Sequence, residues 1–320
     1  MTPPLRPAPI RPADRPGGAA FRIASIGECM IELSGVTAEH AAIGVAGDSF
    51  NTAVYLGRAL DRSAAQVSYV TALGTDSFSD RIVACARAEG IDTRHMHRVA
   101  GALPGLYAIE LDPEGDRRFQ FWRSASAARR LFSDGIGHLD DLDAFDMVYL
   151  SAITLAILPA EVREALVAKC AALRRGGHHV VFDSNYRPQL WPDAGTARDW
   201  IDRMWRATTI ALPSRDDEAR LRPDEAPQAL LERLAAAGVA EIALKDGAAG
   251  PWLWHEGPLA RQTYPAAPRV VDTTAAGDSF NAGYLAARIA GSNPIDAARA
   301  GHELAMQVIG QPGALIPRPA

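Results

Sequence analysis

The sequence predicts an α/β protein with a mainly parallel central sheet, helices on both faces of that sheet and a small β lid. Short apolar runs of strand length alternate with segments of helical periodicity along most of the chain. The apolar fraction of 48% is that of a globular protein with a sizeable core. One hairpin interrupts the alternation. Because a hairpin between helical units does not easily join a parallel sheet, we expect it to project as a lid.

The alternation begins with an apolar run at residues 21–26, which ends at Gly27 and opens onto a tight turn. Strands of a parallel sheet are buried on both faces, so a nearly continuous apolar run is typical of them. Further strands are expected at residues 67–73, 147–151, 179–183, 210–213 and 242–245. Helices are expected at residues 49–60, 76–89, 159–174, 226–237 and 281–290.

The lid is predicted from two strand-like runs, residues 106–111 and 117–122, which are separated by the turn sequence DPEGD. Residues 30–33 are expected to join them. We therefore expect one domain over residues 21–320, with lid strands at about 30–35 and 105–123. The Pro-rich residues 1–20 lack an apolar signal-peptide core and are interpreted as a flexible tail.

Composition argues for a small molecule as the main partner. The net charge is −5 and no block of Lys and Arg occurs, which argues against nucleic acid or an anionic membrane. No apolar run reaches the roughly 18 residues that span a bilayer. The three cysteines lie far apart and suggest neither a disulfide framework nor a zinc site. These features indicate a cytoplasmic protein with reduced thiols.

The most informative segment is DTTAAGDSF at residues 272–280. Its small residues allow a sharp turn into a helix, whose first amide groups then form an anion site. An Asp beside an anion site suits a base that takes the proton from an attacking hydroxyl, as phosphoryl transfer requires. Asp278 alone would also fit the N-cap of a structural helix.

With its flanks, this segment resembles the Asp-Thr-x-Gly-Ala-Gly-Asp signature of the ribokinase-like, PfkB-type carbohydrate kinases, with Ala275 where most members have Gly. The resemblance covers almost the whole chain, including residues 26–33, 70–79, 182–188 and 313–318. It implies a ribokinase-like fold, with ATP and Mg²⁺ as nucleotide and metal. It also implies that Asp278 is the base and that the amides of Ala275, Ala276 and Gly277 stabilise charge on the phosphoryl group.

Within this family, the resemblance implies a small sugar acid as the acceptor. A carboxylate is bound well by the planar guanidinium of Arg, and Arg123 and Arg187 are the candidates. Arg187 follows the strand at 179–183 and so lies at the carboxyl end of the sheet, where ligands bind. Either Arg could instead be a solvated surface residue. The resemblance assigns further substrate contacts to Gly47, Asp48, Asn51 and Tyr107, and places Phe121 where relatives often have Tyr.

The nucleotide side carries no P-loop motif. Residues 245–250, KDGAAG, resemble the family's second nucleotide loop, where Gly allows close approach of the backbone, although a plain turn is the alternative. Residues 214–218 correspond to a stretch in which relatives carry Asn-x-x-Glu. The role in Mg²⁺ binding falls to Asp217 or Glu218, and the sequence does not choose between them. The nucleotide-side residues implied by the resemblance are Ser214, Lys245, Gly247, Gly250, Thr274, Gly277 and Asn281.

The resulting hypothesis is an ATP-dependent kinase of a small sugar acid. Two alternatives stay open: a family member that acts on fructose or ribose, and a sugar-acid sensor without catalysis. Dependence on a monovalent cation and assembly as a homo-oligomer also stay open. His95 and His97, like the pair His178–His179, have no partner at metal-ligand spacing and carry no metal prediction.

Overall fold

The central sheet has eight strands. The computed structural model describes residues 20–37, 39–111 and 117–318, so the predicted turn at 112–116 and all of the predicted tail except Ala20 lie outside the described residues. All neighbouring strands are parallel except the last pair, β11 and β12. Across the sheet the strands are β12 (Trp252–His255), β11 (Glu241–Leu244), β10 (Ile210–Ala211), β9 (His179–Asp183), β8 (Met147–Ser151), β1 (Phe21–Ile26), β4 (Ala65–Leu73) and β5 (Met96–Arg98).

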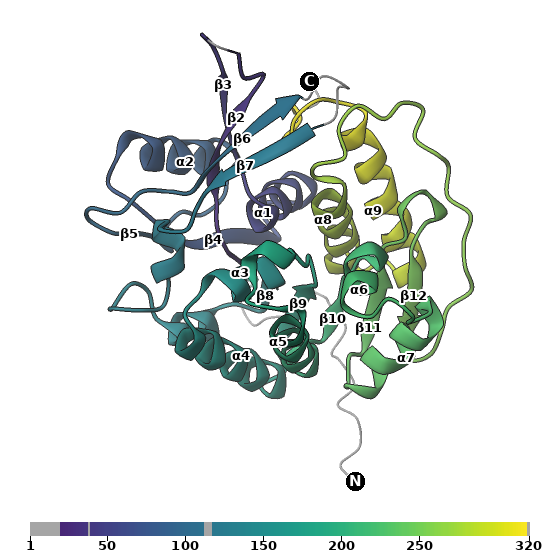
Figure 1. The fold of residues 1–320 in the computed structure, drawn as a ribbon. Helices are drawn as coiled ribbons and strands as arrows, with labels where there is room; N and C mark the ends of the chain where they lie inside the picture. The colour runs from purple at the N-terminus through teal and green to yellow at the C-terminus, as the bar shows by residue number, and fades with distance from the viewer. Residues whose placement is uncertain (1–19, 38, 112–116, 319–320) are drawn as a thin grey trace.

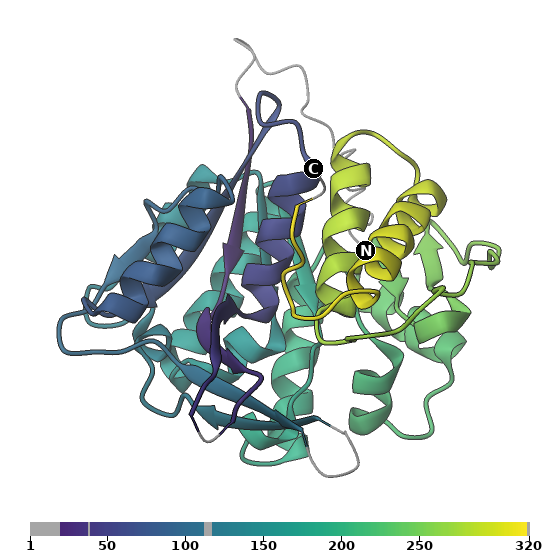
Figure 2. The same cartoon turned by 90° about the horizontal axis from the view of Figure 1, so that it is seen from above.

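Helices cover both faces of this sheet, and each face has its own apolar core (Figures 1 and 2). The central strands β8 and β9 are buried along their whole length, as expected for strands with a helical layer on each side. One face packs against α1 (Asp48–Ala59), α2 (Ser77–Ala88), α8 (Ala276–Ile289) and α9 (Pro294–Ile309). The other packs against α3 (Ala152–Ile157), α4 (Ala160–Arg175), α5 (Ala194–Ala207), α6 (Arg215–Leu221) and α7 (Pro227–Ala236).

A second, smaller sheet projects from the body at the top of Figure 1. Its order is β3 (Ala42–Ala46), β2 (Met30–Ser34), β6 (Leu106–Leu111) and β7 (Arg117–Trp122). The β6–β7 hairpin is antiparallel, whereas β2 and β6 pair in parallel although they are far apart in the chain. Two separate segments of the sequence, one after β1 and one after β5, therefore build this small sheet together.

The predicted elements match observed ones, and most of their boundaries are shifted by a few residues. The largest difference concerns the helix expected at residues 281–290, because α8 begins at Ala276. Asp278 therefore lies inside the first turn of the helix instead of in the loop before it. Several observed elements were not predicted, namely β3, β5, β12, α3, α5, α6 and α9.

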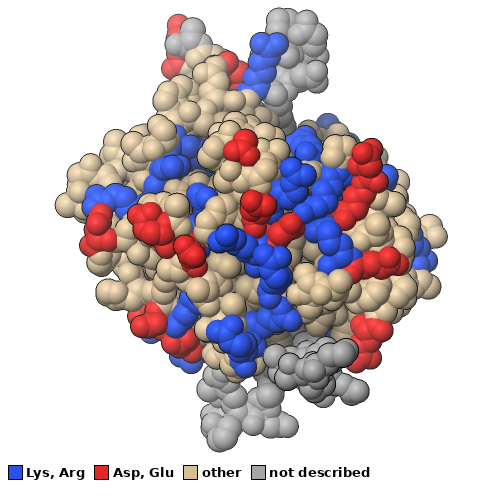
Figure 3. Space-filling model, turned by 60° about the horizontal axis from the view of Figure 1, so that its bottom comes forward, with Lys and Arg blue, Asp and Glu red and all other residues tan. Residues whose placement is uncertain are grey.

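The surface carries charges of both signs. On the face shown in Figure 3, acidic side chains lie beside a band of Lys and Arg. Several arginines are in ion pairs, among them Arg222 with Asp202 at 2.6 Å and Arg58 with Glu89 at 2.8 Å. None of the helices within the described ranges has the length and apolar character that crossing a membrane requires.

Candidate active site

The candidate site lies where strands of the central sheet end and two helices begin. Ser151 ends β8 and Asp183 ends β9, side by side in the parallel register. Lys245 follows the last residue of β11. Asp48 and Asp278 lie in the first turns of α1 and α8. This is the carboxyl edge of a parallel sheet, which is where open α/β sheets bind ligands.

At the amino end of α8 the first helical amide, that of Ala276, already donates to the carbonyl of Thr273 at 3.2 Å. Ala275, at the N-cap, offers no side-chain hydrogen bond to the helix that starts at Ala276. The first amides of a helix lack an intrahelical acceptor, so this end presents partial positive charge. The preceding loop is held by Asp272, whose carboxylate accepts hydrogen bonds from the amides of Thr274 (2.9 Å) and Gly313 (2.7 Å). A fixed loop thus delivers an open helix terminus.

Asp278 is a buried carboxylate in an acidic neighbourhood. The residue is 8% exposed, and one of its oxygens accepts a hydrogen bond from Asn51 Nδ2 at 2.9 Å. Burial raises the pKa of Asp278 well above its usual value, and the negative charge of Asp48 raises it further. Asp183 acts in the same direction, while Asn51 and Lys245 oppose the rise in pKa. Once ionised, such a carboxylate is a stronger proton acceptor than an ordinary one.

Lys245 supplies the positive charge next to this carboxylate cluster. Its Nζ donates to Asp183 Oδ2 at 2.6 Å and to Asn281 Oδ1 at 2.9 Å. A third bond, to the carbonyl of Leu212, measures 2.6 Å. A Cβ added to Gly277 would lie only 3.8 Å from Lys245 Nζ. The ammonium group therefore lies beside the amino end of α8.

Asp48 is fixed by the loops that follow two strands. Its Oδ2 accepts hydrogen bonds from Ser151 Oγ and from Asn185 Nδ2, the latter at 2.7 Å. The preceding Gly47 is required by close packing, since a Cβ there would lie 2.2 Å from the carbonyl oxygen of Glu28. The first turn of α1 is thereby held against the carboxyl edge of the sheet.

The residues predicted on the lid lie on or just after the small sheet and are partly paired. The hydroxyl of Tyr107 donates to Glu32, and Arg123 forms an ion pair with Glu28. Phe121 is 45% exposed, and its ring packs against that of Tyr107 at 5.7 Å between centroids. Two buried polar atoms at this place, Glu28 Oε1 and Arg123 Nε, have no hydrogen-bond partner in the described part of the chain.

Arg187 and Asp217 form a further group beside the acidic cluster. Arg187 Nη1 donates to Asp217 Oδ1 at 3.1 Å and to the carbonyl of Tyr186 at 2.9 Å. Ser214 caps α6 and donates its hydroxyl to Asp217 Oδ2 at 2.8 Å. The side chain of Arg187 is 41% exposed. Asp217 thus links Arg187 and Ser214, three residues for which different roles were predicted.

The two acidic residues left open by the sequence occupy different surroundings. Glu218 is paired with Arg233 of α7 at 2.8 Å, whereas Asp217 is paired with Arg187. Burial raises the pKa of both carboxyls. The pKa of Asp217 also responds to the charges of Asp183 and Lys245, which places it within reach of the acidic cluster. Of the two, Asp217 is the one electrostatically coupled to the candidate site.

The loop after Lys245 is held in a left-handed backbone conformation at two glycines. Gly247 has φ +51° and Gly250 has φ +75°. A Cβ on Gly250 would lie 2.1 Å from the ring of Tyr264, so only glycine fits there. The loop is further fixed by Asp246, whose carboxylate accepts a hydrogen bond from Trp252 Nε1 at 2.9 Å.

The predicted residues that the structure brings together are Asp48, Asn51, Lys245, Gly277, Asp278 and Asn281. Arg187, Ser214 and Asp217 form a neighbouring group, and Tyr107, Phe121 and Arg123 lie at the small sheet.

Sequence reasoning missed Ser151, Asp183, Asn185 and Glu28. A usable signal existed for two of them: Ser151 and Asp183 are polar residues at the ends of otherwise apolar strands, where site residues of parallel sheets are expected. Glu28 and Asn185 lie in the irregular segments that follow β1 and β9, and their partners are set only by the tertiary fold.

Comparison with known proteins gives concordant matches over almost the full length. A family profile described as "pfkB family carbohydrate kinase" matches residues 20–320. The 2-dehydro-3-deoxygluconokinase of Escherichia coli K12 is 42% identical over 93% of this chain and 98% of its own. That of Dickeya dadantii is 44% identical over 92% and 96%. A solved PfkB protein from Polaromonas sp. JS666 superimposes with a TM-score of 0.78 at 25% identity, covering 90% of this chain and 95% of its own.

Proposed function

The chain belongs to the pfkB family of carbohydrate kinases, and from that premise we propose that it is a 2-dehydro-3-deoxygluconokinase. The reaction transfers the γ-phosphoryl group of ATP to the 6-hydroxyl of 2-keto-3-deoxy-D-gluconate. The products are the 6-phosphate and ADP. Use of ATP as donor implies that the protein works in the cytoplasm.

One observation carries the proposal: Asp278 lies at the open amino end of α8, with its pKa raised by burial and by Asp48. In the proposed step Asp278 takes the proton of the attacking hydroxyl. The hydroxyl oxygen forms a bond to the γ-phosphorus while the bond from that phosphorus to the bridging oxygen breaks, and ADP leaves with the electron pair. A raised pKa favours this role, because a carboxylate that binds protons tightly is an effective general base.

Charge on the transferring group is stabilised from one side. We assign this role to the amides of Ala275 and Gly277, because the amide of Ala276 already donates to the carbonyl of Thr273, and Lys245 Nζ lies beside Gly277. Fixed dipoles and a fixed ammonium group need no reorganisation when charge develops, which is the main source of catalysis in phosphoryl transfer. Gly247, Gly250 and Ser214 lie on the loops around Lys245 and Asp217, so we assign them, with Thr274 and Asn281, to the nucleotide side.

The residues present fit a Mg²⁺ ion that accompanies ATP. Mg²⁺ prefers oxygen ligands and is often held by one or two carboxylates together with phosphate oxygens. Asp217 is a buried carboxylate coupled to Asp183, and a bound cation would offset the burial that raises its pKa. Asp217 is paired with Arg187 and Glu218 with Arg233, so the choice between the two rests on the coupling of Asp217 to Asp183. When bound, the ion would neutralise charge on the phosphates, and Asp217 is the side chain we assign to it.

The acceptor is assigned to the space between Asp48, Asn51 and the small sheet. Both hydrogen bonds that Arg187 makes to described residues run through Nη1, which leaves its other nitrogens for a carboxylate. Arg123 is already paired with Glu28, so we assign it and Glu28 Oε1 to sugar hydroxyls. Tyr107, Phe121 and Gly47 complete the walls of this subsite.

A coupled assay of ADP release tests this function. The panel comprises 2-keto-3-deoxygluconate, its galactonate epimer, fructose and ribose, each with MgATP. We expect kcat/KM for at least one of the two acids to exceed that for either neutral sugar by about 100-fold or more, because an Arg–carboxylate pair contributes roughly 3 kcal/mol. Equal turnover of fructose or ribose would contradict the substrate assignment. Ligand binding without ADP release would indicate a sensor and contradict the kinase.

A further inference from the structure

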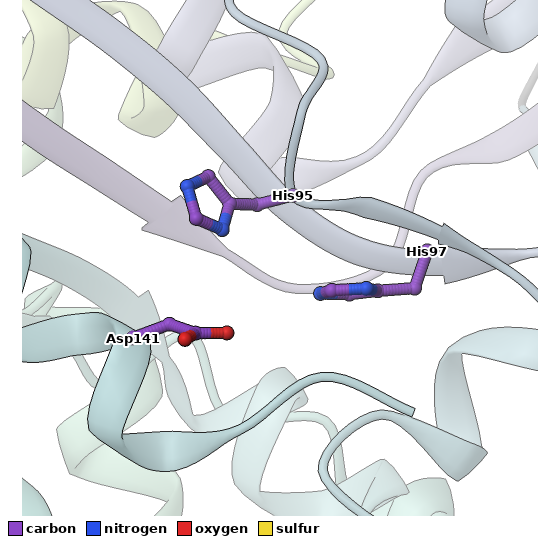
Figure 4. A group of neighbouring side chains, drawn as sticks. All are labelled: His95, His97 and Asp141. Carbon is purple, nitrogen blue, oxygen red and sulfur yellow. The ribbon is translucent and has the colours of Figure 1, made fainter. Parts of the chain in front are cut away.

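A second group of ligating side chains lies at the outer strand of the central sheet. His95 directly precedes β5 and His97 lies within it, while Asp141 lies in the short helix η2 (Leu139–Ala144) that comes before β8. One ligand atom of each residue lies within 4.8 Å of the other two. Figure 4 shows the two imidazole rings and the carboxylate converging on a shared space. The sequence offers no third ligand near the two histidines, and the fold supplies it.

This donor set has the chemistry of a transition-metal site. Two imidazole nitrogens and one carboxylate oxygen suit Zn²⁺, whereas Mg²⁺ prefers oxygen ligands alone. In a tetrahedral zinc site with bonds of about 2.0–2.2 Å, the donor atoms lie roughly 3.3 Å apart. Modest side-chain rotations would therefore complete the site. None of the three residues is fully buried, so water can reach the fourth position.

The surroundings hold the ligands in place. Gly137 has φ +72°, which favours glycine, and a Cβ there would lie 2.7 Å from His97 Nε2, so a larger residue would displace this ring. The amide of His138 donates to Asp141 Oδ2 at 3.4 Å. The ring of His95 packs edge-on against Phe145 at 5.3 Å between centroids. Contacts of this kind orient metal ligands in known sites.

We propose that His95, His97 and Asp141 bind one Zn²⁺ ion, which fastens the outer strand β5 to the segment that leads into β8. β5 has only three residues and pairs with β4 alone. An ion bound only in the folded state would therefore add a link between this edge of the sheet and the segment before β8. The site shares no residue with the acidic cluster, so this proposal stands or falls independently of the kinase function.

Zinc titration of the untagged, EDTA-treated full chain tests the proposal. Calorimetry with ZnCl₂, in the absence of nucleotide, should show saturable binding of about one ion per chain, and Tm should rise with zinc concentration. Substitution of Co²⁺ should give the visible absorption of a low-coordinate site with nitrogen ligands. Millimolar MgCl₂ should not displace the ion. Absence of saturable binding, or complete displacement by Mg²⁺, would overturn the site.

Variants locate the ion. The double variant His95→Gln with His97→Gln should lose binding, and Asp141→Asn, which keeps the shape of the side chain, should weaken affinity by about 10-fold or more. His40→Gln is the matched control, because this side chain is 86% exposed and, among the described residues, its one ion pair is with the neighbouring Glu39. Zinc affinity in the double variant equal to that of the control would refute the assignment. Circular dichroism and ADP release verify that each variant is folded.

Discussion

The two ends of α8 hold buried carboxylates in opposite ways. Toward its carboxyl end, Tyr284 and Arg288 bind Glu241 at the start of β11, with bonds of 2.7 Å from the hydroxyl and 2.8 and 2.9 Å from the guanidinium. At its amino end, Asp278 receives one amide hydrogen bond from Asn51 and faces two other acids. The first carboxylate is neutralised and the second is not.

The difference separates a structural group from a reactive one. A buried ion pair with all its hydrogen bonds made stabilises the fold only if both partners are present. A buried carboxylate next to like charges costs stability, and proteins keep such groups mainly where a shifted pKa is useful. The carboxyl end of α8 thus holds a structural carboxylate, and its amino end holds a reactive one.

The largest expected effect is the loss of turnover in Asp278→Asn. Removal of the proposed general base should lower kcat by about 10³-fold or more, with little change in the KM for the acceptor. Coupled ADP release measures both constants. The matched control is Asp296→Asn, since Asp296 occupies the first turn of the neighbouring helix α9 but is exposed. A value of kcat within tenfold of the wild type would exclude Asp278 as the base.

The opposite end of the helix should give the reverse pattern. Glu241→Ala leaves Arg288 buried without its partner and should lower the free energy of unfolding by about 3 kcal/mol, while kcat of the folded enzyme stays within about twofold. Urea denaturation measures the loss. The double variant Glu241→Leu with Arg288→Met should recover part of it. If the single variant were as stable as the wild type, the structural role assigned to Glu241 would be wrong.

The smallest effect concerns stability and pH. Because burial raises the pKa of Asp278 in the folded state, that state binds more protons than the unfolded state above about pH 4, and this residue's contribution to stability falls as pH rises. Asp278→Asn should therefore increase the free energy of unfolding by about 1 kcal/mol at pH 8, and the gain should vanish near pH 4. Denaturation at both values measures it. A loss of stability at pH 8, relative to Asp296→Asn, would contradict the acidic neighbourhood.

Much of the fold could be predicted from the sequence because the central strands are apolar on both faces. The strands at residues 147–151 and 179–183 were predicted with their observed ends, since polar residues bound both runs. A short element such as β5 depends on pairing with its neighbour and carries little periodic signal of its own, whereas the strand predicted at 210–213 is observed as the shorter β10. The strand β3 was missed because all but one of its residues are exposed or half-buried.

The candidate site could be predicted in part. Asp278 stands in a segment whose small residues indicate a turn into a helix. Lys245 stands at the start of a glycine-containing segment that follows a strand. The pairing of Arg123 with Glu28, and of Arg187 with Asp217, could not be foreseen, because each joins segments that only the folded sheet brings together. For the same reason Asp141 was not seen as a neighbour of His95 and His97.

The bonds within the acidic cluster join residues far apart along the chain. Asn51 and Asp278 are separated by 227 positions, and Asp183 and Asn281 by 98. Contacts between residues so far apart in the chain form slowly and late in folding, because the entropy of the intervening chain is lost before the contact forms. During refolding from denaturant, a collapsed intermediate with most of its helices would thus still be inactive. Recovery of catalysis would then report the final consolidation of the whole domain.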